Sequence, residues 1–594
     1  MASTNDTTCQ PLYSIQQLLE WQPSQLAETL YSQVPLSDYA IARALEPRQR
    51  VLACHDFKGG YLEYEKQPQG ITGQAASSAI HRREAFIFRH WVRIETIFDV
   101  CAYSHSSSYV DIFVYFSHHR VTIPPVGWIE SAHRHGTLVL GTFIFEWEQA
   151  CRELISAVGD EERRSKVAEQ LVCIAKTCGF EGWLFNFEVH LPSRQYVGWI
   201  GDLLKQTCDR MKEEIGPHAL VLWYDAVTVR GHLRWQNRLN EENYYYFERC
   251  DGIFTNYHWH PNDVWSSALA SQGRPWDVFT GIDVFGRGTF GGGGFQSYIA
   301  AQVAKQMGTS IALFAFGWTL EGCDKDDCFE DNCFRFWEAP TNSIHSVFPP
   351  RPLWTQLDEE TFWETGCGYH SFVQGQRVVS SKPYIHLRKQ QLQPSYTRQH
   401  VYWDKKSHRI APTMDATCMV RVSTDMECGY GSGCSLYFQW NKEAVMERGW
   451  IAHIIAETDI WITKDIFHCR YWLRTRTLEQ ARLFGIGFVT AGNGTEQVAI
   501  PRNIFSPNVI NMFSDTFRWI PCVASQKVCT REQGGVWLET SLELDKEDWE
   551  KHVENSSICK VLLFIVLDRG LVNEQDGEHW LTCHLGGIQM QAKK

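Results

Sequence analysis

Residues 50–318 alternate short, nearly continuous apolar runs with longer amphipathic stretches. Eight such runs occur, and they cover 50–57, 109–118, 137–147, 182–189, 219–226, 252–259, 277–285 and 310–318. Strands of a parallel sheet are buried on both faces, so their sequences are apolar almost throughout. The runs therefore predict parallel strands, each followed by a crossover to the next.

Helical patterns separate several of these runs. One helix is predicted over 163–177, and a second over 193–216, with Ser193 as its N-cap and Gly216 at its end. A third is predicted over 296–307. Eight strand–helix units in this order predict a (β/α)8 TIM-type barrel. The first crossover is long and apolar, and we interpret 84–108 as an insertion.

The pattern changes after the prolines of "SVFPPRPLW". Short strand-like runs then alternate with turn signals, and no long helical period recurs. This predicts an all-β sandwich region, as one sandwich or two small ones. The predicted organisation is an N-terminal extension (1–49), a catalytic barrel (50–345) and a C-terminal accessory region (346–594).

Composition narrows the classes of partner. The chain has 594 residues, of which 44% are hydrophobic and 21% charged, and its formal net charge is −13. A negative chain of this kind is unsuited to nucleic acid. Neither an export signal nor an apolar run of about 18 residues is found, so we expect no membrane contact. The 20 scattered cysteines then favour reduced thiols in the cytosol. No obligate protein partner is inferred.

One cysteine cluster contains residue types that can bind a metal. Cys323, Cys328 and Cys333 follow an x4 spacing twice, whereas zinc sites use closer pairs. The acidic residues between them lack the turn glycine of a calcium loop. We therefore favour a solvated loop and expect no metal and no cofactor.

The strand at 182–189 carries two polar residues, Asn186 and Glu188. Alternation places both on one face, about 7 Å apart, at the carboxyl end where barrels bear their active sites. Burial would let Glu188 hold a proton near neutral pH and donate it to a leaving oxygen. An amide cannot replace the second carboxylate of a glycosidase. It can orient a substrate 2-acetamido group that attacks the anomeric carbon itself.

Other strand ends carry polar and aromatic side chains that suit sugar faces and hydroxyls. As candidate substrate-binding residues they are His55, Glu146, Trp147, Asn256, Tyr257, Trp259, Asp283 and Trp318, with Tyr224 beside Asp225 at the fifth strand.

Several motifs also carry a family resemblance. "CHDFKGGY", "GFEGWLFNFE", "LVLWYDAV", "LRWQNRLN", "DGIFTNYHW" and the block 110–147 resemble glycoside hydrolase family 85, the family of cytosolic endo-β-N-acetylglucosaminidases. The likeness runs over about 51–337. Glu181, Val189 and Phe316 depart from the residues usual in the family.

The resemblance implies an activity and roles for residues. Such enzymes cut the GlcNAc-β-1,4-GlcNAc bond in the chitobiose core of N-glycans and free oligosaccharides, without a metal. The family's catalytic Asn and Glu fall on Asn186 and Glu188, its active-site tyrosine on Tyr224, and an acceptor-side tryptophan on Trp235.

Three other interpretations remain open at this point. The chain could be a glycan-binding protein whose insertion has impaired catalysis. It could be a two-carboxylate retaining glycosidase with Asp225 or Asp283 as nucleophile. Asn186 and Glu188 could also be no more than a satisfied polar pair inside the barrel.

Overall fold

The structure is a computed structural model that describes residues 7–81, 109–322, 332–339 and, with gaps, 341–592. The gaps within the last range are 356, 358, 393–399, 405–408, 414–419, 426–427, 463–465, 493–494, 503–509, 511–516, 533–534, 554–556 and 567–579. The predicted insertion at 84–108 lies outside the described residues, as do Cys323 and Cys328. Cys333 is described and is buried.

The N-terminal half forms a closed barrel of parallel strands. They are β1 (Val51–His55), β3 (Ile112–Tyr115), β5 (Leu138–Glu146), β6 (Gly182–Glu188), β7 (Leu220–Tyr224), β8 (Gly252–Phe254), β9 (Val278–Asp283) and β10 (Ser310–Phe314). Each pairs in parallel with the next, and β10 closes on β1. The short β4 (Val121–Thr122) adds an antiparallel pairing to β5. The predicted barrel is therefore confirmed.

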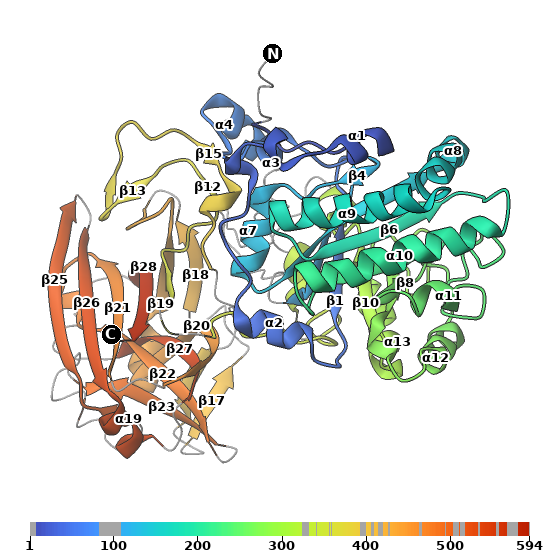
Figure 1. Cartoon of the computed structure of the whole chain (residues 1–594). Coiled ribbons are helices and arrows are strands. Elements are labelled where there is room, and N and C mark those ends of the chain that lie inside the picture. Colours follow the sequence, from blue (N-terminus) through green and yellow to red (C-terminus); the bar gives the residue numbers. More distant parts are fainter. Residues whose placement is uncertain are drawn as a thin grey trace.

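Helices cover the outside of this barrel (Figure 1). Between the strands run α3 (Glu63–Lys66), α4 (Gln74–His81), α7 (Val126–Arg134), α8 (Trp147–Val158), α9 (Glu161–Cys178), α10 (Gln195–Glu214), α11 (Tyr244–Phe247), α12 (Pro261–Ala270) and α13 (Ser297–Met307), and α14 (Trp318–Glu321) follows β10.

Two of these helices test the end signals predicted from the sequence. Asp160 caps α9 by accepting from the Arg163 N–H, and Gly179 ends it in the left-handed conformation. Ser193 was predicted to be the N-cap of α10, but Arg194 occupies that position. The helix begins at Gln195, and the Ser193 hydroxyl accepts from the Gln195 N–H at 3.4 Å.

Strand alternation divides the apolar side chains into two cores. Leu52, Cys54 and Leu184 belong to a cluster inside the barrel, together with residues of the other strands. Their neighbours in sequence, such as Ala53 and Phe185, pack outward against the helices. This parity decides which polar residue at each strand end faces the barrel interior.

The segment before the barrel packs on its outer surface. Helix α1 (Ile15–Glu20) lies against α9, where the Gln170 amide donates to the carbonyls of Leu19 and Trp21 at 3.0 and 3.1 Å. Helix α2 (Asp38–Ala44) precedes β1. A small antiparallel sheet joins segments that are far apart in sequence. In it, β15 (Tyr384–Ile385) pairs with β2 (Ile71–Thr72) and with β12 (Cys367–Gly368).

The C-terminal region is a β-sandwich of two sheets. One contains β18 (Val420–Asp425), β19 (Ser435–Asn441), β28 (Trp580–Ala592), β21 (Ile466–Thr475), β26 (Gly535–Asp545) and β25 (Val523–Glu532), with β11 (Glu359–Thr361) beside β28. The other contains β17 (Arg409–Thr413), β16 (His400–Asp404), β20 (Trp450–Trp461), β27 (Ser557–Val566), β22 (Phe484–Gly492), β23 (Thr495–Pro501) and β24 (Arg518–Ile520). Buried residues of both sheets belong to one core cluster, so the described strands form a single sandwich.

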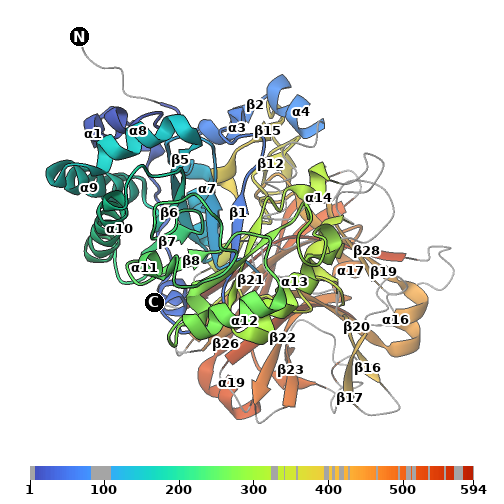
Figure 2. The ribbon, with the colours of Figure 1, turned by 90° about the vertical axis from the view of Figure 1, so that its right-hand side faces the viewer.

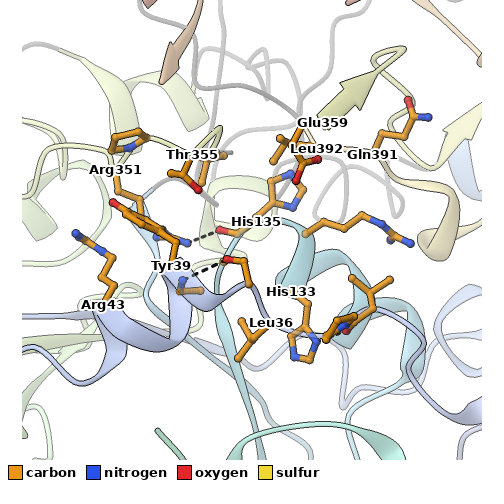
Figure 3. Close-up of a pocket in the computed structure, with 18 of the residues that line it drawn as sticks. Leu36, Tyr39, Arg43, His133, His135, Arg351, Thr355, Glu359, Gln391 and Leu392 are labelled. Carbon is orange, nitrogen blue, oxygen red and sulfur yellow. Dashed lines mark hydrogen bonds between the residues drawn. The ribbon is translucent and has the colours of Figure 1, made fainter. Parts of the chain in front are cut away.

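Barrel and sandwich lie side by side (Figures 1 and 2). Arg351 is buried at their junction, where its guanidinium donates to the carbonyls of Val110 and His135 and to the Thr137 hydroxyl. A cavity of about 400 Å³ adjoins this arginine (Figure 3). Of its lining residues, Arg43 in α2 precedes β1 and His135 precedes β5, so the cavity lies at the end of the barrel opposite Glu188. The boundaries predicted at 49/50 and 345/346 remain predictions.

Candidate active site

A second cavity, of about 250 Å³, opens at the carboxyl ends of the barrel strands. It is lined by Cys54, Phe116, His118, Glu146, Leu184, Asn186, Glu188, Tyr224, Trp235, Phe254, Asn256, Tyr257 and Phe314. Seven of these were predicted from the sequence, namely Glu146, Asn186, Glu188, Tyr224, Trp235, Asn256 and Tyr257. Catalytic residues of TIM barrels occupy this end of the fold.

Asn186 and Glu188 both line this cavity, on the face of β6 that also carries Leu184. Asn186 is buried, and its amide nitrogen donates to Glu146 Oε1 at 3.3 Å. Its carbonyl oxygen Oδ1 is buried but has no hydrogen-bond partner among the residues that the structure describes. A buried acceptor without a partner is costly unless a ligand satisfies it.

Glu188 has the protonation behaviour of a general acid. Burial raises its pKa to about 7, and the like charge of Glu146 adds to this rise. A hydrogen bond from the Asn186 amide and the positive charge of His118 act in the opposite direction. Near neutral pH the carboxyl group can therefore hold a proton and also release it, as acid–base catalysis requires.

His118 lines the cavity and was missed by the sequence reasoning. It lies three residues beyond the end of β3, and its Nδ1 contacts Glu146 Oε2 at 3.0 Å. This hydrogen bond raises the pKa of His118. The signal for it in the sequence is its position at the end of the apolar run 109–118.

A chain of hydrogen bonds fixes the opposite wall. The Tyr224 hydroxyl donates to Asn256 Oδ1 at 3.0 Å, and the Asn256 amide donates to Asn237 Oδ1 at 2.8 Å. Burial raises the pKa of Tyr224 well above its usual value, so the hydroxyl keeps its proton. It can therefore act as a donor at any physiological pH.

Asp225 organises the loop that carries Trp235. Its carboxylate accepts from the backbone N–H groups of Gln236 (3.1 Å) and Asn237 (2.7 Å) and from the Asn243 amide (2.9 Å). Burial nevertheless raises its pKa to about 6. Asp225 is therefore bound to its own loop, and it does not line the cavity.

The structure does not bring His55 or Trp259 to the cavity. His55 faces outward because Cys54 takes the inward position on β1, and its ring packs against Trp128 at 4.9 Å. Trp259 is buried, and its indole donates to the Gly281 carbonyl at 2.7 Å. Their positions at strand ends could not reveal which way each side chain points.

Three other predicted residues lie outside the cavity lining. Asp283 is buried and accepts from Arg287 Nε at 2.7 Å. Trp318 borders a separate, open depression beside Phe295. Trp147 follows Glu146 directly, is 77% exposed and has a φ of 71°. A large residue with positive φ is strained, which is typical of functional sites.

Possible metal ligands gather at one place in the described part of the chain, outside the barrel. These are Asp425, Cys428 and His584 in the sandwich, where Arg474 also donates to the Cys428 sulfur at 3.1 Å. Among the described helices, none has the length and apolarity needed to cross a membrane.

Comparison with known proteins decides the family. The pattern of glycosyl hydrolase family 85 matches residues 81–385, more than half of the chain. The chain belongs to glycosyl hydrolase family 85. The resemblance seen in the motifs is thereby confirmed.

Curated relatives of this family-85 chain carry one name in several organisms. The chain is 36% identical over 440 residues to the cytosolic endo-beta-N-acetylglucosaminidase of Homo sapiens, covering 72% of this chain and 51% of the relative. It is 37% identical over 359 residues to cytosolic endo-beta-N-acetylglucosaminidase 2 of Arabidopsis thaliana, covering 59% and 45%. The chain thus spans about half the length of these relatives.

A solved structure has the same fold. The glycoside hydrolase domain of Endo-D from Streptococcus pneumoniae R6 superposes with a TM-score of 0.65 at 16% identity, covering 99% of this chain and 83% of that one. The superposition extends over both barrel and sandwich.

Proposed function

We propose that this chain is an endo-β-N-acetylglucosaminidase. It hydrolyses the GlcNAc-β-1,4-GlcNAc bond in the chitobiose core of N-glycans and free oligosaccharides. The observation that carries the proposal is the pair on β6, a carboxyl group with a pKa of about 7 and a buried amide with an unsatisfied carbonyl oxygen in the same cavity. The names of the curated relatives support the substrate class.

In the first step the substrate supplies the nucleophile. The 2-acetamido carbonyl oxygen attacks the anomeric carbon, the bond to the leaving oxygen breaks, and Glu188 gives its proton to that oxygen. An oxazolinium ion remains, whose N–H is more polarised than that of the substrate. Asn186 Oδ1 accepts this N–H, so the interaction strengthens as charge develops.

In the second step water opens the oxazolinium. Glu188, now ionised, takes a proton from the water as its oxygen attacks the anomeric carbon from the face that the leaving group vacated. Configuration at that carbon is therefore retained, and both side chains return to their starting states. No cofactor enters either step.

Aromatic side chains at the cavity supply the sugar-binding surface. Trp235 is 40% exposed and lines the cavity, and Trp147 is exposed beside Glu146. We assign both to stacking on sugar rings of the glycan or of its GlcNAc acceptor side. Partners are then N-glycans, glycopeptides and free oligosaccharides. By analogy with the named relatives, we place this activity in the cytosol.

The contacts of the two aspartates support this mechanism over a two-carboxylate one. Asp225 is held by its own loop, and Asp283 by Arg287. A nucleophile must reach the anomeric carbon, and neither carboxylate lines the cavity that holds Glu188.

The test is incubation with a high-mannose glycopeptide, followed by mass measurement of the products. We expect a peptide that keeps a single GlcNAc and a released glycan that is shorter by one GlcNAc. Glu188→Gln should release none while still binding the glycopeptide. A wild-type chain that binds the glycopeptide but cuts nothing would make it a glycan-binding protein instead.

A further inference from the structure

Glu146 lies between two polar side chains of the active site. Its Oε1 accepts from the Asn186 amide at 3.3 Å, and its Oε2 contacts His118 Nδ1 at 3.0 Å. It ends β5 and is the register partner of Glu188 on β6. Its side chain is only 12% exposed, and each of its two oxygens contacts a group of the protein.

A carboxylate determines the orientation of the amide beside it. An asparagine amide has two orientations, related by a half-turn, that fill nearly the same space. An ionised carboxylate only accepts hydrogen bonds, so the NH2 side of Asn186 must face Glu146. A hydrogen bond from Asn186 to Glu188 engages the same side. The carbonyl oxygen is left turned away from both, buried and without a partner among the described residues.

We infer that Glu146, held by His118, is a positioning residue that keeps Asn186 Oδ1 directed at the substrate's acetamido N–H. The inference rests on the proposed function and deepens it. Glu146 itself does not touch the reacting atoms. Without it, the Asn186 amide can turn and present an N–H to the acetamido N–H, which would repel it.

A double-mutant cycle tests this role, because a residue that acts only through Asn186 has nothing to add once Asn186 is gone. The variants are Glu146→Ala, Asn186→Ala and both together, with kcat/KM measured on a glycopeptide at the pH optimum of each. We expect Glu146→Ala alone to lower kcat/KM by about 10- to 100-fold, mostly through kcat. In the Asn186→Ala background the same change should have less than about a threefold effect.

Two further variants serve as controls. Glu148→Ala removes a nearby exposed carboxylate from the first turn of α8, the helix that Glu146 precedes, and should leave kcat/KM within about twofold of wild type. Glu146→Gln still offers an oxygen to the Asn186 amide and should recover most of the activity lost in Glu146→Ala. N-acetylglucosamine thiazoline mimics the oxazolinium when its ring nitrogen is protonated and donates its N–H to Asn186 Oδ1, so its inhibition should weaken in Glu146→Ala about as much as kcat falls.

Equal losses from Glu146→Ala with and without Asn186 would overturn the inference, since Glu146 would then act on the substrate independently. An unchanged thiazoline inhibition constant in Glu146→Ala would overturn it too, since that constant does not scale with kcat. Failure of the proposed function has a different signature, because the wild-type chain itself would then release no glycan.

Discussion

Glu146 and Glu188 are register partners on the neighbouring parallel strands β5 and β6, so two carboxyl groups lie side by side at the mouth of the barrel. The negative charge of Glu146 and burial both disfavour ionisation of Glu188, and its pKa rises to about 7. The two carboxyl groups therefore have different roles: Glu146 holds the Asn186 amide, and Glu188 carries the proton.

The first prediction concerns the pH dependence of activity. Glu188 must be protonated to donate, so kcat/KM should fall about tenfold per pH unit above pH 7. Glu146→Gln removes the neighbouring negative charge, so the fall in kcat/KM should begin at lower pH. A pH profile of kcat/KM for both proteins measures this shift, and a fall that begins at the same pH in both would show that Glu146 does not influence Glu188.

The second prediction concerns stability. The folded pKa of Glu188 is raised, so ionisation favours the unfolded chain. This destabilisation of the folded state is absent below pH 4 and complete above about pH 7. Glu188→Gln should therefore stabilise the barrel by about 1–3 kcal/mol at pH 8 and hardly at all at pH 4. Thermal unfolding of both proteins at the two pH values checks this, and equal stabilisation at both would contradict it.

The third prediction concerns Trp147, whose φ of 71° strains the backbone. Trp147→Gly should relieve about 1 kcal/mol of strain and raise the melting temperature, whereas Trp147→Ala keeps the strain. Both variants lose the exposed ring, so both should raise KM by about threefold to tenfold with little change in kcat. If KM stays at the wild-type value in both, Trp147 does not contact the glycan.

The fourth prediction concerns Asp225. Asp225→Ala leaves the N–H groups of Gln236 and Asn237 and the Asn243 amide without their acceptor. It should destabilise the barrel by about 2–5 kcal/mol and raise KM, because the loop also carries Trp235. A 2-fluoro sugar should label no residue in the wild-type enzyme. Labelling of Asp225 would instead identify it as a nucleophile.

Strand prediction succeeded where burial is complete. Strand β6 is buried along its length except at the half-buried Glu188, and parity alone places Asn186 and Glu188 on one side of it. The same alternation excludes His55 from the barrel interior, because it stands next to the inward-facing Cys54.

Loop residues were less predictable. Trp259 was predicted from its place at a strand end, and Trp235 only from the family resemblance. One is buried against the Gly281 carbonyl, and the other lines the cavity. The difference arises from the path of each loop, which Asp225 fixes for Trp235 through hydrogen bonds within the loop.

The sequence by itself determined the eight strands, the face of β6 that bears the acid and the amide, and the family. These follow from local periodicity and from motifs of adjacent residues. Only the tertiary structure decided that Glu146 holds Asn186, that His118 holds Glu146, and that Asn186 keeps one acceptor unsatisfied. Such contacts depend on the register between neighbouring strands and on where loops pack, and both are set by residues far apart in the chain.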